Sequence, residues 1–247
     1  MKKITLLLLL SALFIGCVKK NEILPANTLD NGLVAHYPLD GNAKDMTRYS
    51  NNGEISAMVS SDRKNVSRKA YQFDTDTSYF QSYNIPIKLN GKYTFSFWIK
   101  MNSFDDGMSV MELTKNKEFG KNPQIWQYND SLFLVPTFQS HNRIFIYSLK
   151  KDSNVAKMAP TMGYSWNHVL WTVDGTLTKM YVNGIRVDQK AVIWPDYTDV
   201  DLTLGNSGNN GGGGANYRNQ PSKVSIDEVK IYNRVLFETE IKKLSER

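Results

Sequence analysis

Short segments in which apolar and polar residues alternate follow one another through most of the chain from Gly32 onward. Successive side chains of a strand point to opposite faces. In KYTFSFWIKM, for example, one face would carry Tyr93, Phe95, Phe97 and Ile99, and the other Thr94, Ser96, Trp98 and Lys100. QIWQYN, SLFLVPTF and RIFIYSL continue the pattern, separated by polar turns. Many short strands with almost no helical periodicity predict an antiparallel all-β sandwich or barrel.

Two turn signals strengthen this prediction. The segment WNHVLWTVDGTLTKMYVNGIRVDQ reads as three strands joined at Asp174-Gly175 and at Asn183-Gly184. Asp-Gly and Asn-Gly between alternating runs are strong signals for tight hairpins. A final strand, VSIDEVKIY, precedes a stretch in which Leu236, Ile241 and Leu244 suggest one short C-terminal helix.

The final strand carries two adjacent acids. Strict alternation would place Asp227 on a face with Val229 and Ile231, and Glu228 on a face with Ile226 and Lys230. A carboxylate in line with core residues is costly to bury unless its charge is compensated. The pattern therefore predicts that Asp227 lies at a wet rim of the sheet or has a cation beside it.

The N-terminus, MKKITLLLLLSALFIGC, reads as a secretory signal peptide that is too short for a comfortable transmembrane span. The only cysteine of the chain, Cys17, ends this segment and resembles the lipidated cysteine of bacterial lipoproteins. We therefore expect a leader over residues 1–16, a lipidated cysteine and polar tether over 17–30, and a folded domain over 31–247.

Length and charge restrict the function further. The 247 residues fit one all-β domain, and the lone cysteine leaves none for disulfides within the domain. Loss of Lys2 and Lys3 with the leader reduces the net charge from +6 to about +4, and no basic stripe marks a nucleic-acid site. A lipid on Cys17 would hold the chain at a bacterial outer membrane. The sequence Lys19-Lys20-Asn21-Glu22 that follows leaves the choice between surface and periplasmic display open.

Four motifs in order carry a family resemblance: GLVAHYPLDGNAKDMTRYSNNG, YTFSFWIK, WNHVLWTVDGTLTKMYVNGIRVD and SIDEVKIYNRVL. Together they resemble the laminin-G-like, concanavalin A-like jelly-roll domains of bacterial surface proteins, over residues 32–244. The resemblance implies two packed antiparallel sheets, carbohydrate or glycoconjugate binding, and often a structural calcium ion. Phe237 departs from the family, in which a serine or similar residue usually caps the C-terminal helix.

Calcium takes six to eight oxygen ligands, and the loop LDGNAKD offers Asp40, Asn42 and Asp45. The family places its first and last strands side by side, which would bring Asp227 to this loop. Asp40-Gly41 and Asn42 are also ordinary turn formers. The expected Ca²⁺ site therefore consists of Asp40, Asn42, Asp45 and Asp227, with a plain turn as the alternative.

Sugar binding requires aromatic faces beside amide and carboxylate groups. QIWQYN places Trp126 and Tyr128 on one strand face beside Gln124, WPDY offers Trp194 and Tyr197 on a loop, and Tyr217 follows the glycine tract SGNNGGGG. We expect these six residues to line the ligand site. For Trp126, Trp194 and Tyr217, packing in the core is the competing interpretation.

No catalytic residues are assigned. Glucan-cleaving relatives of this fold carry Glu-x-Asp-x-x-Glu on one strand, which is not found here, and Glu112 stands alone in VMELTKNKEF. The predicted function is thus non-catalytic binding of a glycan or glycoconjugate. An adhesin or assembly subunit that binds a protein partner is one alternative, and a glycoside hydrolase whose two carboxylates come from different segments is the other.

Overall fold

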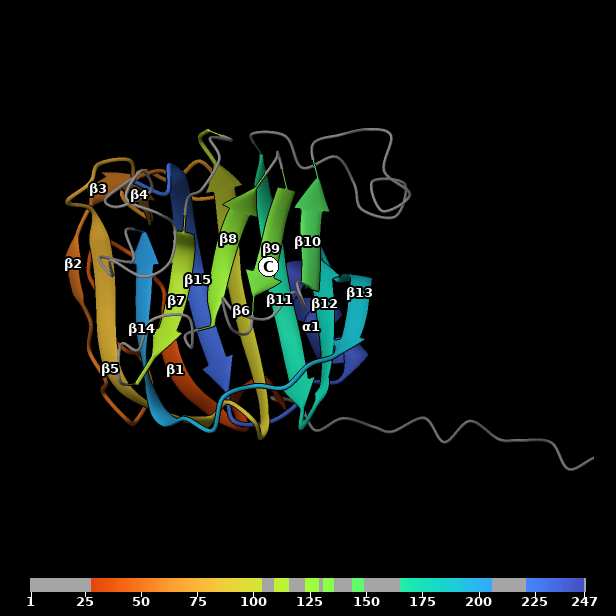
Figure 1. Ribbon diagram of the computed structural model, residues 1–247. Coiled ribbons are helices and arrows are strands. Elements are labelled where there is room, and N and C mark those ends of the chain that lie inside the picture. Colours follow the sequence, from red (N-terminus) through yellow and green to blue (C-terminus); the bar gives the residue numbers. More distant parts are fainter. Residues whose placement is uncertain are drawn as a thin grey trace, which may run out of the picture.

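The computed structural model describes residues 28–103, 109–115, 123–128, 131–135, 144–148, 165–205 and 221–246. Two antiparallel sheets pack face to face, as the sequence predicts, and Figure 1 shows them as a front and a back layer. Within the described residues, no helix is long and apolar enough to cross a membrane.

The first sheet, the back layer of Figure 1, has eight strands. They are β1 (Leu33–Tyr37), β3 (Met58–Ser60), β4 (Ala70–Phe73), β6 (Lys92–Met101), β11 (Trp166–Asp174), β12 (Leu177–Val182), β13 (Ile185–Ala191) and β15 (Val224–Tyr232). Seven follow in the order β13-β12-β11-β6-β15-β4-β3, and β1 also pairs with β15. One edge of β15 is therefore shared: β4 pairs with its first residues and β1 with its last ones.

The second sheet has seven strands in the order β10-β9-β8-β7-β14-β5-β2. They are β2 (Glu54–Ser56), β5 (Tyr79–Lys88), β7 (Ser109–Thr114), β8 (Gln124–Tyr128), β9 (Ser131–Val135), β10 (Ile144–Ser148) and β14 (Thr198–Gly205). Neighbours β5 and β14, or β14 and β7, are far apart in the sequence, so the order of this sheet depends on long-range pairing.

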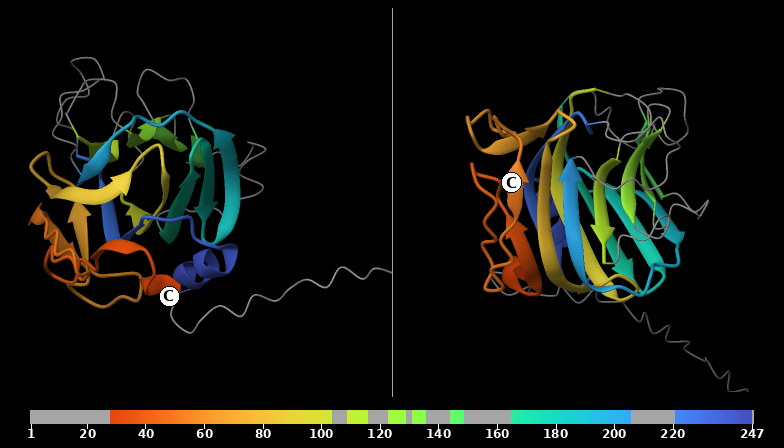
Figure 2. Two further views of the ribbon diagram at one scale, coloured as in Figure 1. Left: turned by 90° about the horizontal axis from the view of Figure 1, so that it is seen from below. Right: turned by 60° about the vertical axis from the view of Figure 1, so that its left-hand side comes forward.

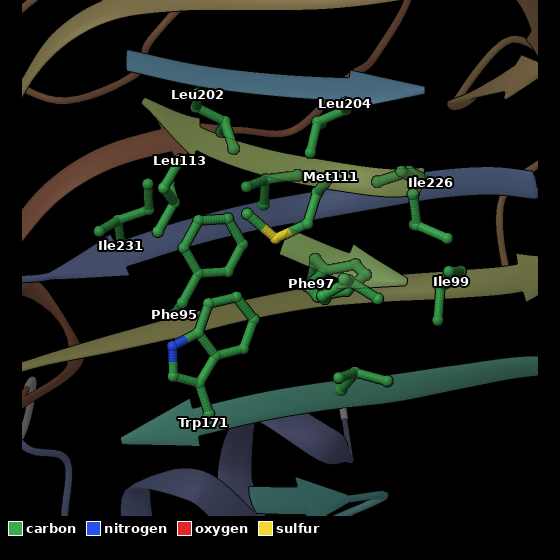
Figure 3. Close-up of a cluster of buried hydrophobic side chains, with 14 of the residues drawn as sticks. Phe95, Phe97, Ile99, Met111, Leu113, Trp171, Leu202, Leu204, Ile226 and Ile231 are labelled. Carbon is green, nitrogen blue, oxygen red and sulfur yellow. The ribbon is translucent and has the colours of Figure 1, made fainter. Parts of the chain in front are cut away.

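The core lies between the inner faces of the two sheets. Figure 3 shows Leu202, Leu204, Met111 and Leu113 of the second sheet above aromatic and aliphatic residues of the first. The Trp171 ring stacks on Phe95 with centroids 4.4 Å apart, and both side chains are fully buried. Burial of such side chains contributes about 1.5–3 kcal/mol each, which explains how this fold is stabilised without disulfides.

Both predicted hairpins are confirmed. β11 ends at Asp174 and β12 begins at Leu177, while β12 and β13 are joined by Asn183 and Gly184. Asn183 and Gly184 both have positive φ, 49° and 77°. Two successive residues with positive φ match the strand twist of a two-residue hairpin, and Asn-Gly tolerates this conformation best.

The outer face of the first sheet is covered in part by the C-terminal helix α1 (Glu238–Ser245), which Figure 2 shows outside the sandwich. A second apolar cluster joins helix, sheet and N-terminus, and consists of Leu29, Leu170, Tyr181, Tyr232, Leu236, Ile241 and Leu244. Leu29 belongs to a 3-10 turn (Thr28–Asp30) and is 6% exposed. The folded body thus already begins in the segment that the sequence assigned to the tether.

The helix begins after Phe237, which supplies no side-chain cap. Instead, the buried carboxylate of Glu240 accepts a hydrogen bond from the Phe237 N–H at 2.9 Å. It also accepts hydrogen bonds from Nη2 and Nη1 of Arg234, at 2.7 and 2.8 Å. This carboxylate satisfies a helix N-terminal donor from within the helix, as the glutamate of a capping box does. The missing serine is therefore compensated by an ion pair.

A bulge interrupts β15 at the two adjacent acids. Asp227 and Lys230 pair with β6 residues only two positions apart, so the two residues between them face a single residue of β6. Glu228, the first of these two, has a φ of 52°. A bulge reverses the alternation of a strand. Ile226 before the bulge and Val229, its second residue, accordingly both lie in the core, and the prediction that Asp227 shares a face with Val229 is wrong.

Candidate functional site

The outer face of the second sheet carries a row of polar side chains. Gln81 of β5 lies opposite Thr203 of β14, Thr203 opposite Glu112 of β7, and Glu112 opposite Gln124 of β8. Directly opposed residues of paired strands share a face. The sequence neighbours of the row point into the core, among them Leu202, Leu204, Met111, Leu113 and Ile125. Alternation within each strand thus directs the polar residues outward.

The row contains a buried carboxylate. Glu112 is 2% exposed and Gln124 is 6% exposed, and Gln124 Nε2 donates a hydrogen bond to Glu112 Oε1 at 3.3 Å. At the β5 end, the Tyr83 hydroxyl donates to Gln81 Oε1 at 2.8 Å. A carboxylate, two amides and the Thr203 hydroxyl therefore lie along four neighbouring strands, and these groups are hydrogen-bond donors and acceptors of the kind that bind hydroxyl-rich ligands.

Aromatic rings flank the row. Trp126 follows Gln124 by two positions and so shares its face, and Phe133 of β9 lies opposite Trp126. Both rings are partly buried. At the other end of the row, Tyr83 is 42% exposed. Rings next to amide and carboxylate groups are the combination that the sequence analysis required for sugar binding.

A second carboxylate lies on the same face. Asp201 of β14 is opposite Thr114, two residues along β7 from Glu112, so the two acids are diagonal neighbours. Diagonal residues of an antiparallel pair are about 7–8 Å apart. Asp201 Oδ1 accepts the backbone N–H of Asn84 at 3.0 Å. The structure thus brings together two acids that no sequence pattern pairs.

The predicted ligand residues do not all meet on this face. Gln124 and Trp126 lie on it together, while the Tyr128 side chain and all of Tyr217 fall outside the described residues. Tyr197 is partly buried and packs against the core from the segment between β13 and β14. The ligand role of these residues stays a prediction.

Trp194 is a correction. Its side chain is 3% exposed, its Nε1 donates to Thr178 Oγ1 at 2.8 Å, and its ring meets Tyr93 edge-on with centroids 5.8 Å apart. A ring enclosed on both faces cannot stack on a sugar. The competing interpretation of core packing is the right one here, because the irregular segment WPDY folds back onto the sandwich.

The predicted calcium ligands have other partners. Asp45 is 7% exposed, and its two oxygens accept the N–H groups of His36, Thr47 and Asn51 at 2.9–3.0 Å. Asp40 pairs with Lys69 at 2.8 Å. Asn42 Oδ1 accepts the N–H of Lys44 at 2.9 Å, as expected of an Asx turn. The Asp45 carboxylate therefore holds the loop together by accepting backbone N–H groups.

Asp227 is compensated by an arginine. Its Oδ2 accepts a hydrogen bond from Arg63 Nη1 at 2.7 Å, and the Arg63 guanidinium lies over the Trp98 ring, 4.8 Å from its centroid. The prediction of a cation beside Asp227 is right, but the cation is a guanidinium. No three His, Cys, Asp or Glu residues of the described segments form a group that could hold a metal ion. The Ca²⁺ site of Asp40, Asn42, Asp45 and Asp227 stays a prediction.

The sequence analysis missed Gln81, Tyr83, Thr203 and the relation between Glu112 and Asp201. Alternation marks Gln81 and Thr203 as outward-facing once their strands are known. The signal that was absent is the strand order, because β5, β7 and β14 are separated by long stretches of chain. Only the register shows that these residues form one row.

The fold and this face define a lectin-like sandwich. Residues 74–242 match the model of the concanavalin A-like lectin/glucanases superfamily. The chain belongs to this family. No curated protein matches the chain.

Solved structures with the same fold include several binding domains. The binding domain of Paraclostridial Mosquitocidal Protein 1 is similar with a TM-score of 0.60 and 19% identity over 87% of this chain and 52% of that domain. Domain 4 of AbnA, an extracellular arabinanase from Geobacillus stearothermophilus, was solved with arabinotriose. Its TM-score is 0.57, with 19% identity over 86% of this chain and 98% of that domain. The binding domain of botulinum neurotoxin DC, solved with rat synaptotagmin II, has a TM-score of 0.60, with 16% identity over 87% of this chain and 51% of that domain. The chain thus spans about half the length of the toxin domains.

Proposed function

We propose that this protein is a cell-envelope lipoprotein that binds a glycan or glycoconjugate without cleaving it, through the outer face of the second sheet. The observation that carries the proposal is the row Gln81, Thr203, Glu112 and Gln124, with Trp126 at one end and Tyr83 at the other. The membership in a lectin-like family and the arabinotriose in AbnA domain 4 support a sugar as the ligand.

The row matches the chemistry of a sugar ring. Hydroxyl groups both donate and accept, so they pair with the amide of the partly buried Gln81 and with the small parts of Gln124 and Thr203 that reach the surface, 6% and 8% exposed. The C–H face of a sugar is apolar and packs on a ring such as Trp126 or Tyr83. Because the row lies on four hydrogen-bonded strands, its groups are held before the ligand arrives, which lowers the entropic cost of binding.

Membrane attachment is part of the proposal. A lipid on Cys17 would hold the domain at the bacterial outer membrane, and Thr28, the first described residue of the folded body, follows eleven residues later. An extended tether of this length reaches at most about 40 Å. The domain would therefore act close to the membrane surface, on either the periplasmic or the external side.

A glycan-array screen of residues 18–247 tests the binding function. We expect a defined set of glycans to bind, and Trp126→Ala to weaken that binding about tenfold, since the substitution removes one stacking surface. Trp166→Ala is the matched control, because Trp166 is partly buried at the other sheet, where Lys100 lies over its ring. Equal losses in both variants would contradict the placement of the glycan site at Trp126, and no bound glycan would favour a protein partner, as in the neighbouring domain solved with synaptotagmin.

A glycoside hydrolase is the second candidate, and the diagonal pair Glu112 and Asp201 favours it. Glycosidases hold two carboxyl groups about 5–10 Å apart across the scissile bond. Incubation of each array-positive glycan with the protein, followed by reducing-end analysis, separates the candidates. Binding without new reducing ends supports the lectin, whereas release that Glu112→Gln abolishes supports the enzyme.

A further inference from the structure

A pocket of about 390 Å³ lies on the outer face of the first sheet, between the N-terminal turn, the segment around Arg63, the bulge of β15 and the helix α1. Its size falls in the range of small-ligand sites, about 300–1,000 Å³. It is separate from the polar row, which lies on the other sheet. Four segments that are distant in the sequence meet at it.

One wall of the pocket is apolar. Leu29 of the turn, Leu33 of β1 and Leu244 of α1 line it, together with Tyr232 at the end of β15. Leu29 and Leu244 belong to the cluster that attaches the helix and the N-terminal turn to the sheet. This wall is therefore fixed by packing that the fold needs in any case, and Leu33, which is only partly buried, offers most of the wall's aliphatic surface to a ligand.

The other part of the lining is ionic and is held by internal pairs. Glu228 Oε2 lies 3.2 Å from His36 Nε2 and is also hydrogen-bonded by Lys230 Nζ. Arg63 is fixed by Asp227 beneath it and by the Trp98 ring. The side chains of Arg63, His36, Glu228 and Lys230 are only 12–24% exposed. These groups are ordered before any ligand binds.

Lys64 adds a cation that the fold does not use. Its side chain is exposed at the pocket, and its ammonium group has no ionic partner among the described residues. Among the cations of the lining, Arg63 is paired with Asp227 and Lys230 with Glu228, so Lys64 is the described one that an incoming anion can use. Glu228 is already bonded to two donors, so an incoming cation gains little from it.

We propose that this pocket binds an organic carboxylate with an aliphatic body. The aliphatic part lies against Leu29, Leu33 and Leu244, and the carboxylate lies at the ionic wall beside Lys64 and Lys230. Neither a purely polar sugar nor an apolar molecule uses both walls. A carboxylate at a half-buried ammonium forms a charge-assisted hydrogen bond, which is stronger than a neutral one.

Octanoate is the probe, measured by isothermal titration calorimetry on residues 18–247. We expect saturable binding of octanoate and at least about tenfold weaker binding of octan-1-ol and of octylammonium, which share the aliphatic body but lack the carboxylate. Lys64→Glu should weaken octanoate binding about tenfold or more. Lys44→Glu, at an exposed lysine outside the pocket, makes the same change in net charge and should leave binding unchanged.

Leu33→Asn tests the apolar wall without a change in charge, at a partly buried position. We expect it to weaken octanoate binding, and a thermal melt shows whether each variant is folded. Absence of octanoate binding in the folded protein, binding of octylammonium or octan-1-ol equal to that of octanoate, or equal effects of Lys64→Glu and Lys44→Glu would each overturn the proposal. Glycan binding does not enter this readout, so the two proposals can fail separately.

Discussion

The outer faces of the two sheets carry buried polar groups of different kinds. On the first sheet, buried charges pair with opposite charges: Asp227 with Arg63, and Glu240 with Arg234. On the second sheet, Gln124 donates a hydrogen bond to the buried Glu112, which lies in a row with the Gln81 amide and the Thr203 hydroxyl. Both faces adjoin one common core, so they differ in the polar groups that each carries outward.

This difference indicates which polar residues serve the fold. A buried ion pair loses much of its gain to desolvation, but removal of one partner leaves a charge without compensation. Arg63, Asp227, Arg234 and Glu240 attach a loop and a helix to the first sheet, so we assign them to stability. For the amides, hydroxyls and rings of the second sheet we propose a role in recognition.

The largest expected effect is on the first sheet, where Arg63→Leu leaves Asp227 buried without its cation. Loss of one partner of a buried ion pair costs about 3–5 kcal/mol. We therefore expect the free energy of unfolding, from urea denaturation at pH 7.5, to fall by roughly this amount. The double variant Arg63→Leu with Asp227→Asn should recover part of the loss. A single variant as stable as the wild type would show that Asp227 is compensated in another way.

The strand β15 shows why the sequence predicts the strands and hairpins better than the face to which each side chain points. Alternation and turn residues are local, and they identified the hairpins at Gly175 and Gly184. The bulge in β15 has no local signal, since it places Glu228, not a glycine, at positive φ. It occurs where the edge partner of β15 changes from β4 to β1, which is a property of the strand order. One inserted residue reversed the predicted facing of Asp227.

The candidate site, too, was predictable within a single strand but not across distant strands. QIWQYN marks Gln124 and Trp126 as neighbours on one face, because that follows from the period of a single strand. Gln81, Thr203 and Glu112 join them through pairing between strands that are distant in the sequence. Trp194 was misread for a related reason: the polar and irregular residues around it do not show that its loop folds back onto the core.

The two adjacent acids of β15 should respond oppositely to pH. Burial raises the pKa of Asp227 to about 7, although Arg63 acts against this. Burial also disfavours the charge of Glu228, but the His36 hydrogen bond and the Lys230 charge outweigh it and lower the pKa to about 2. The stabilisation linked to Asp227 is therefore present in acid and is lost as the pH rises from about 4 to 7. That of Glu228 is present above about 4.5 and is lost as the pH falls toward 2.

Urea denaturation of Asp227→Asn and Glu228→Gln at pH 3, 5 and 7.5 measures both contributions. Relative to the wild type, Asp227→Asn should become more favourable as the pH rises from 5 to 7.5. Glu228→Gln should be most destabilising at the two higher pH values and least at pH 3. Parallel pH profiles for the two variants would mean that the bulge does not separate the environments of these acids.

The smallest expected effect on stability is on the second sheet, at Tyr83. This side chain is 42% exposed and makes one described hydrogen bond, to Gln81, so Tyr83→Ala should reduce the free energy of unfolding by no more than about 1 kcal/mol. Tyr49→Ala is the matched control, at a tyrosine of similar exposure, 37%, outside the polar row. If the second face serves recognition, only Tyr83→Ala should weaken glycan binding, by several-fold, while both variants remain folded. Comparable glycan affinities for the two variants would remove Tyr83 from the site and confine recognition to the Trp126 end of the row.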